Sequence, residues 1–118
     1  MELKTLVATV LDAVKAADLN TIYSLLMIAK EELKLKTEIT MASVEYVVRQ
    51  LVDEGYLVEY EESSLDLSKR WKKYIATDKI KELAREPPQK IAQISKMRYV
   101  TPSFYYLLNY SSKGSRGS

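Results

Sequence analysis

The sequence predicts a mainly α-helical fold that carries one small β-hairpin, an α+β class. Two observations predict it. Apolar residues recur with the period of an amphipathic helix in three consecutive segments before residue 55. After Gly55 this period is lost, and residues 56–62 and 69–76 are rich in aromatic and β-branched side chains, which favour strands.

The first two helices are predicted over about residues 3–17 and 21–34. Each has one apolar stripe at steps of three and four residues. The stripes consist of Leu3, Leu6, Val7, Val10, Leu11, Val14 and Ala17, and of Ile22, Leu25, Leu26, Ala29 and Leu33. Between the helices, residues 18–20 offer turn and capping side chains.

The third helix is predicted over about residues 41–54, with Thr40 as its N-cap. Its stripe consists of Val44, Val47, Val48, Leu51 and Val52. Gly55 follows, and glycine takes the left-handed conformation that ends many helices without a Cβ penalty. We therefore expect helix 41–54 to end there.

The hairpin is predicted over about residues 56–76, with a loop at residues 63–66. A fourth helix is expected at about 78–86, capped by Thr77 and stopped by Pro87 and Pro88. These elements would form one domain, residues 1–86.

Residues 87–112 are expected to form a C-terminal extension. A helix is predicted at about 88–98, and a second, short helix over the aromatic-rich segment 103–110. The Ser- and Gly-rich residues 113–118 are expected to be a disordered tail or a cloning remnant, and they enter no argument about the fold.

The composition excludes many kinds of catalytic site. The 118 residues contain no His and no Cys, and Gly55 is the one glycine before the tail. A thiolate zinc site, a His-dependent triad and a glycine-rich phosphate loop are therefore excluded. A catalytic or metal site built from carboxylates alone is not excluded, but no spacing of Asp and Glu residues in the sequence indicates one. We expect no catalytic residue, no metal and no cofactor, and thus a binding protein.

The longest apolar run, residues 25–29, is too short to cross a bilayer, and the N-terminus has no secretion-signal pattern. We therefore expect a cytoplasmic protein with no membrane partner. Many Lys, Glu, Tyr and Ile residues beside few Asn and Gln hint at a thermophilic source.

Charge is unevenly distributed along the chain, although the formal net charge is only +2. Residues 1–60 hold 6 basic and 10 acidic side chains, whereas residues 61–118 hold 12 basic and 6 acidic ones. The densest basic cluster surrounds Trp71. It consists of Lys69, Arg70, Lys72 and Lys73. Such a cluster is either a solvated face or a binding surface for an anionic partner.

The order of elements resembles a winged helix-turn-helix domain. The segment SVEYVVRQLVDEGYL, residues 43–57, is similar to the recognition helix of that family and the start of its hairpin. The segment RWKKYIATD, residues 70–78, is similar to the return strand of the wing in MarR-type and PadR-type transcriptional regulators. The resemblance covers about residues 3–85.

The resemblance implies a sequence-specific protein that binds double-stranded DNA. Helix 41–54 would enter the major groove, where Arg49 can contact guanine and Gln50 adenine. The implied recognition-helix contacts are Thr40, Ser43, Tyr46, Arg49 and Gln50. The wing would neutralise phosphates through Lys69, Arg70, Lys72 and Lys73.

Structural roles compete with these assignments. Arg49 is spaced for an ion pair within its helix, with Glu45 or Asp53. Gln50 could be a solvated helix residue, and Tyr46 could pack on the edge of the core. Trp71 is expected to be a buried anchor of the wing rather than a residue that stacks on DNA.

The alternation of a strand also limits the basic cluster, because successive side chains point to opposite faces. Arg70 and Lys72 would share one face, and Lys69, Trp71 and Lys73 the other. The acidic residues of helix 41–54 weaken the DNA hypothesis. The alternative is a winged-helix module that binds another protein within a larger complex.

The aromatic-rich extension favours a homodimer, since large exposed aromatic side chains need a partner surface. The same residues could instead fold back on the first helix. The expected interface consists of Leu3, Val7, Tyr99, Phe104, Tyr105 and Leu108. In regulators of the resembled type, such a dimer spaces two recognition helices about one DNA turn apart.

Overall fold

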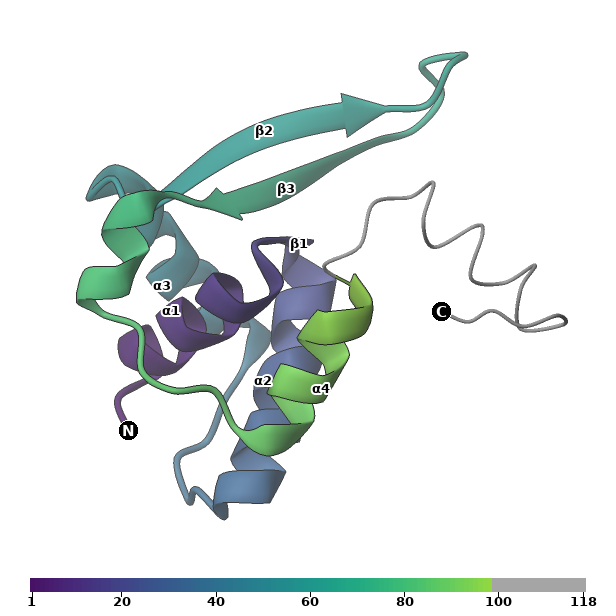
Figure 1. Ribbon diagram of the computed structural model, residues 1–118. Helices are drawn as coiled ribbons and strands as arrows, with labels where there is room; N and C mark the ends of the chain where they lie inside the picture. The colour runs from purple at the N-terminus through teal and green to yellow at the C-terminus, as the bar shows by residue number, and fades with distance from the viewer. Residues whose placement is uncertain (99–118) are drawn as a thin grey trace, which may run out of the picture.

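The structure, a computed structural model, describes residues 1–98. Three helices, α1 (Leu3–Val14), α2 (Leu19–Leu33) and α3 (Met41–Asp53), precede a hairpin of β2 (Leu57–Ser63) and β3 (Arg70–Ala76). The hairpin projects away from the helices, and α4 (Gln89–Arg98) lies beside α2 (Figure 1). The predicted α+β class is confirmed.

A short third strand was not predicted. Strand β1 (Ala16–Asp18) pairs antiparallel with β3, which gives the sheet order β1-β3-β2. The prediction that the first helix extends to residue 17 was therefore wrong. Helix α1 ends at Val14 because Lys15 takes a positive φ of 76° and its carbonyl accepts a hydrogen bond from the Ala76 amide, 2.9 Å away.

The predicted N-cap of α3 is confirmed, whereas α2 begins at Leu19, two residues before its predicted start, because Asp18 caps it. Asp18 precedes α2, and its carboxylate accepts a hydrogen bond from the Thr21 amide at 2.8 Å. Thr40 precedes α3 and forms a reciprocal capping box with Ser43. These side chains satisfy amide groups that have no partner within the helix.

The predicted role of Gly55 is also confirmed. Its φ is +87°, in the left-handed region. The following amide, that of Tyr56, donates to the Leu51 carbonyl at 2.8 Å, which closes the helix end. The chain therefore turns directly from α3 into β2.

The segment after the hairpin differs from its prediction. A single 3₁₀ segment, η1 (Asp78–Glu82), replaces the expected helix 78–86. Thr77 does not cap it, because the Thr77 hydroxyl donates instead to the Gly55 carbonyl at 2.8 Å. The threonine thus ties the end of β3 to the turn after α3.

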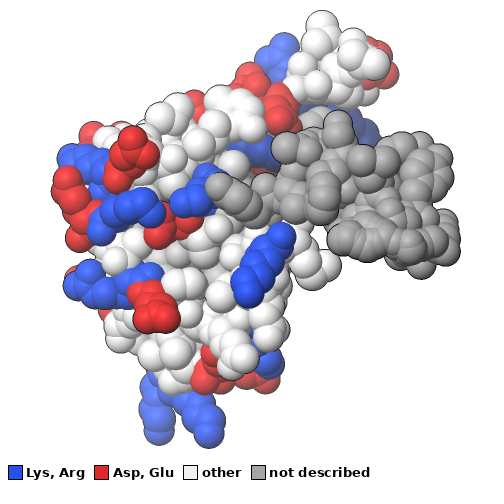
Figure 2. Space-filling view, in the orientation of Figure 1, with Lys and Arg blue, Asp and Glu red and all other residues white. Residues whose placement is uncertain are grey.

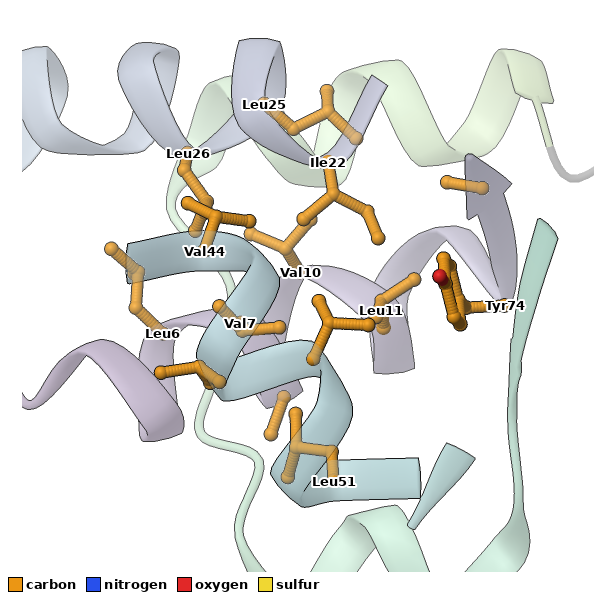
Figure 3. Packing of buried hydrophobic residues seen from close by; sticks show 14 of the residues in the cluster. Leu6, Val7, Val10, Leu11, Ile22, Leu25, Leu26, Val44, Leu51 and Tyr74 are labelled. Atoms are coloured by element: carbon orange, nitrogen blue, oxygen red, sulfur yellow. The ribbon is translucent and has the colours of Figure 1, made fainter. Parts of the chain in front are cut away.

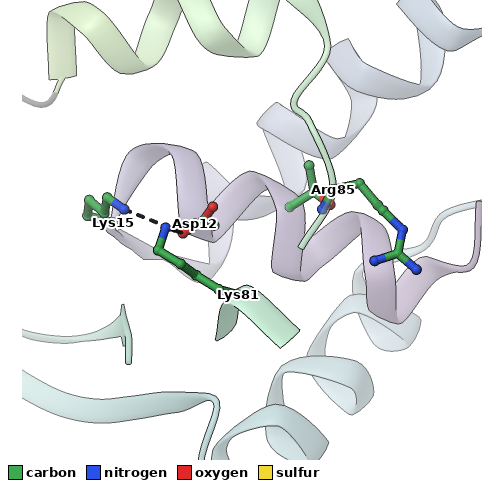
Figure 4. A network of polar contacts seen from close by, with 5 residues as sticks. Asp12, Lys15, Lys81 and Arg85 are labelled. Atoms are coloured by element: carbon green, nitrogen blue, oxygen red, sulfur yellow. Dashed lines mark hydrogen bonds and ion pairs between the residues drawn. The ribbon is translucent and has the colours of Figure 1, made fainter. Parts of the chain in front are cut away.

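Polar contacts hold η1 and the segment after it against α1. Lys81 lies 3.0 Å from Asp12, which also accepts from Lys15 at 3.4 Å (Figure 4). The Arg85 amide donates to the hydroxyl of the fully buried Thr9 at 2.9 Å. A continuous helix over 78–86 would not place the Arg85 amide at this acceptor.

Helix α4 confirms the helix predicted at 88–98. Its N-terminus receives a tertiary cap, since the Glu32 carboxylate of α2 accepts from the Gln89 and Lys90 amides at 2.7 and 2.9 Å. Ile91, in the first turn of α4, is fully buried in the core. The short helix predicted over 103–110 lies outside the described residues.

The core is built around α1. Leu6, Val7 and Val10 gather with Leu26 of α2 and Val44 of α3, and all are 1% exposed or less (Figure 3). The hairpin contributes Leu57 and Tyr74 to this core, and both are buried. Trp71, which was predicted to be the buried anchor of the wing, is 39% exposed. That prediction was therefore wrong, because Trp71 lies on the strand face that points away from the core.

Candidate nucleic-acid interface

The exposed face of α3 carries the side chains that the sequence assigned to base contacts. Tyr46 is 66% exposed, so it does not pack on the edge of the core. The side chain of Arg49 is 47% exposed, and Gln50 is half-buried. The valine stripe faces the core on the opposite side. The helix therefore presents Tyr46 and Arg49 to an approaching partner.

Thr40 and Ser43 are engaged in the structure of the helix start. The Ser43 amide donates to the Thr40 hydroxyl oxygen at 3.1 Å, and the Ser43 hydroxyl donates to the Thr40 carbonyl at 2.8 Å. A hydroxyl used in this way is less free to contact DNA. Their main observed role is thus to fix where α3 begins.

Arg49 pairs with the hairpin and not within its helix. Its Nη2 atom lies 2.9 Å from Oε2 of Glu59 on β2. The hydrogen bond from Arg49 is the main cause that lowers the pKa of the Glu59 carboxyl below its ordinary value. The ion pair within the helix, with Glu45 or Asp53, which was the structural alternative to a base contact, is therefore not the pair that forms, since the guanidinium reaches across to the neighbouring strand.

Glu59 connects two further groups to this pair. Its Oε2 atom also accepts from the Tyr74 hydroxyl at 3.1 Å and lies 3.6 Å from Lys72 Nζ. Burial and the bond to Glu59 raise the pKa of the Tyr74 hydroxyl. A single carboxylate thus holds α3, β2 and β3 together.

The predicted alternation along β3 is confirmed for four residues. Arg70 and Lys72 lie on the face that turns toward α3, where they meet Glu61 at 3.9 Å and Glu59 at 3.6 Å. Trp71 and Lys73 lie on the other face, and both meet Glu62. The basic residues are therefore divided between the two faces of the hairpin.

The outer face of the hairpin, which carries Trp71 and Lys73, has its own central carboxylate, Glu62, just as the inner face, which carries Arg70 and Lys72, has Glu59. It accepts from the Trp71 indole nitrogen at 2.7 Å and from the Tyr60 hydroxyl at 3.2 Å, and lies 3.5 Å from Lys73 Nζ. The bond from Trp71 is the main cause that lowers the pKa of the Glu62 carboxyl. Among the described residues, Lys69 is the one member of the basic cluster with no ion pair.

The sequence analysis missed these acidic partners on β2. Strand β2 pairs with β3 in a register that places Glu61 opposite Lys72 and Glu62 opposite Trp71. The three Glu residues of segment 57–63, two of them spaced for one strand face and the third for the other, were a signal for this arrangement. It could be interpreted only once the length of the hairpin loop, and hence the register, was known.

A cleft of about 550 Å³ lies between the N-terminus of α2, the exposed face of α3 and the inner face of the hairpin. Its charged lining is balanced, with three acidic and three basic side chains: Asp18, Glu45, Glu61, Arg49, Arg70 and Lys72. Tyr74 also contributes to the lining, and so does Trp71, although its indole bonds Glu62 on the other face of the hairpin. Of the predicted residues, the cleft brings Arg49, Arg70 and Lys72 to one concave surface, which is not purely basic. Its lining does not include the other predicted residues, which are Thr40, Ser43, Tyr46, Gln50, Lys69 and Lys73.

The expected dimer residues are only partly described. Val7 is fully buried within the chain, so assigning it to an interface was wrong. Leu3 is half-buried at the start of α1 and contacts the core. Tyr99, Phe104, Tyr105 and Leu108 lie outside the described residues.

Within residues 1–98, no helix is both long enough and apolar enough to cross a membrane. Comparison with protein-family models, with curated proteins and with solved structures found no match to this chain.

Proposed function

We propose that the chain is a winged-helix protein that binds double-stranded DNA and regulates transcription. The observation that carries this proposal is the cleft, where the exposed face of α3 and the inner face of a projecting hairpin share one concave surface. In this arrangement α3 enters the major groove and the hairpin lies along the adjacent backbone.

Specificity in this proposal comes from α3. Arg49 and Gln50 would read base edges, and Tyr46, which is exposed, would contact a phosphate or a base. Affinity comes from the hairpin, where Lys69 and Arg70 stand nearest the tip. Arg70 is held only at 3.9 Å from Glu61, so exchanging this partner for a phosphate costs little.

A selection of bound duplexes from a random pool tests the division of roles. The variant with Arg49→Ala and Gln50→Ala should select a different or less defined sequence. The variant with Lys69→Ala and Arg70→Ala should keep the wild-type preference but bind every duplex more weakly. An unchanged preference in the first variant would contradict the role of α3.

The balanced charge of the cleft favours a second candidate function. Phosphate attraction supplies most non-specific affinity for DNA, and three acidic residues lie among the cleft's three basic ones. A winged-helix module that binds another protein would tolerate this balance. Purification from its source with a stoichiometric protein partner and no nucleic acid would support this function instead.

We further propose that the protein acts as a homodimer, which would present two copies of α3 to one DNA site. Met97, in the last turn of α4, is 58% exposed and adjoins the aromatic-rich residues that follow in the sequence. Light scattering at ~100 μM protein should give twice the monomer mass. A monomer at that concentration would refute this role for the C-terminal residues.

A further inference from the structure

The tip of the hairpin presents two leucines to solvent. Leu65 is 105% exposed and Leu67 is 64% exposed, so neither contributes to the core. Figure 2 shows uncharged surface at the projecting tip, with basic and acidic side chains on either side of it. Large apolar side chains held so far from the core indicate a contact with a partner.

The loop that carries these leucines is ordered by its own hydrogen bonds. Oδ1 of Asp66 accepts from the Ser64 hydroxyl at 2.7 Å, and from the Ser68 amide and hydroxyl at 3.0 and 2.8 Å. The Ser64 amide donates to the Lys69 carbonyl at 3.0 Å. The leucines therefore project from a defined turn, which lowers the entropy lost when they bind.

The backbone of Leu67 adds a second, independent observation. Its φ is +62°, in the left-handed region that glycine or asparagine takes more easily than leucine. A leucine at this position costs stability and gains nothing from burial. Residues held in such conformations are concentrated at binding sites.

The surroundings of the tip match a DNA groove. The last three residue pairs of the hairpin, which include Ser63 with Arg70, extend beyond the segment of β3 that pairs with β1. A narrow ribbon thus projects from the body of the protein. Lys69 and Arg70 lie directly behind the leucines, at the positions from which cations would meet the phosphates that flank a groove.

We propose that Leu65 and Leu67 form an apolar wedge that enters the minor groove, separates two stacked base pairs and bends the duplex. Leucine is among the side chains that act in this way in proteins that bend DNA. The proposal rests on the DNA-binding function proposed above. It adds that the bound duplex is deformed and that the leucines, not the cations, deform it.

Energy transfer between dyes at the two ends of a short duplex tests the wedge, with binding measured in the same samples. The wild-type protein should bend the duplex by about 20° or more. The variant with Leu65→Ser and Leu67→Ser should bind with an unchanged salt slope but leave the duplex nearly straight. Methionine at both positions should retain the bend, because it is also an apolar wedge.

Leu33→Ser is the matched control, since Leu33 is a 39% exposed leucine at the far end of α2 and should affect neither quantity. A wild-type complex with a straight duplex would overturn the wedge alone and would favour a protein partner for the tip. A serine variant that bends DNA like the wild type would also overturn it. No duplex binding by the wild type would overturn the proposed function and the wedge together.

Discussion

Arg49 of α3 and Glu59 of β2 form an ion pair between the helix and the hairpin, with 2.9 Å between Nη2 and Oε2. The pair joins the helix assigned to base contacts to the hairpin assigned to the backbone. It also occupies the guanidinium that is proposed to contact guanine. To contact guanine, Arg49 must therefore leave the Glu59 carboxylate or share its guanidinium between the two. Glu59 is thus expected to lower the affinity for DNA.

Glu59→Gln should increase affinity for duplex DNA. The substitution removes the negative charge that pairs with Arg49 and Lys72, two of the three basic residues in the cleft lining. We expect roughly three- to tenfold tighter binding at ~50 mM salt, with a smaller gain at higher salt. Fluorescence anisotropy with a labelled duplex measures it.

Glu38→Gln is the matched control for this prediction. Glu38 is an exposed carboxylate in the connector between α2 and α3, and within residues 1–98 it forms no ion pair, whereas Glu59 pairs with Arg49 and Lys72. It should change affinity little. Equal effects of the two substitutions, or weaker binding by Glu59→Gln, would contradict the proposed opposition between Glu59 and DNA.

Removing cations from the hairpin tip should change the salt dependence of binding. The variant with Lys69→Ala and Arg70→Ala should reduce the slope of log affinity against log salt by about 0.9 for each lost phosphate contact. The control variant, with Lys34→Ala and Lys36→Ala, also removes two positive charges, but at the C-terminal end of α2, away from the hairpin. If both double variants gave the same slope, the hairpin would not be the phosphate-binding element.

Asp66 should titrate at unusually low pH. The hydrogen bonds from Ser64, and then those from Ser68, lower the pKa of its carboxyl from 3.8 to about 2. Because the pKa is lower in the folded state, the contribution of this group to loop stability is present above pH 4. It is lost as the pH falls from there through about 2.

Carbon NMR of the Asp66 carboxyl group against pH measures this value. Substituting both Ser64 and Ser68 by alanine should move the midpoint back toward 3.8, since it removes both hydroxyl donors. A wild-type midpoint near 4 would mean that the loop is not ordered around Asp66. It would also weaken the argument for a preformed wedge.

Gly55→Ala should destabilise the protein by about 1 kcal/mol, because a Cβ disfavours the left-handed conformation. The glycine has a φ of +87°, and an added Cβ would meet only the Lys79 side chain at 3.9 Å, an ordinary contact. The cost therefore comes from the backbone and not from a clash. Gly55→Asn should cost less, because asparagine tolerates this conformation better.

Urea unfolding followed by circular dichroism gives the free energies for the three proteins. The expected order of stability is glycine, then asparagine, then alanine. A fully stable Gly55→Ala variant would contradict the role of Gly55 in ending α3.

The features that the sequence predicted correctly depend on neighbouring residues. Thr40 and Ser43 form their capping box within one helical turn, and Gly55 ends α3 through its own backbone. The apolar stripes likewise follow from the period of the helix. Local chemistry was sufficient for these elements.

The features that were missed depend on tertiary contacts. Strand β1 is three residues long and exists because Ala17 pairs with Tyr74 of a distant strand. The hydroxyl of Thr77 bonds the turn after α3 in place of capping a helix. The partner of Arg49, Glu59, was not among the alternatives considered, because it lies ten residues away on β2. No pattern within a single element contains this information.

The salt-dependent affinity of the wild-type protein for duplex DNA tests the central proposal most directly. Anisotropy titrations from ~50 mM salt upward should show binding at micromolar protein that weakens linearly on a log–log plot. The absence of duplex binding at micromolar protein in ~50 mM salt would contradict the proposed function.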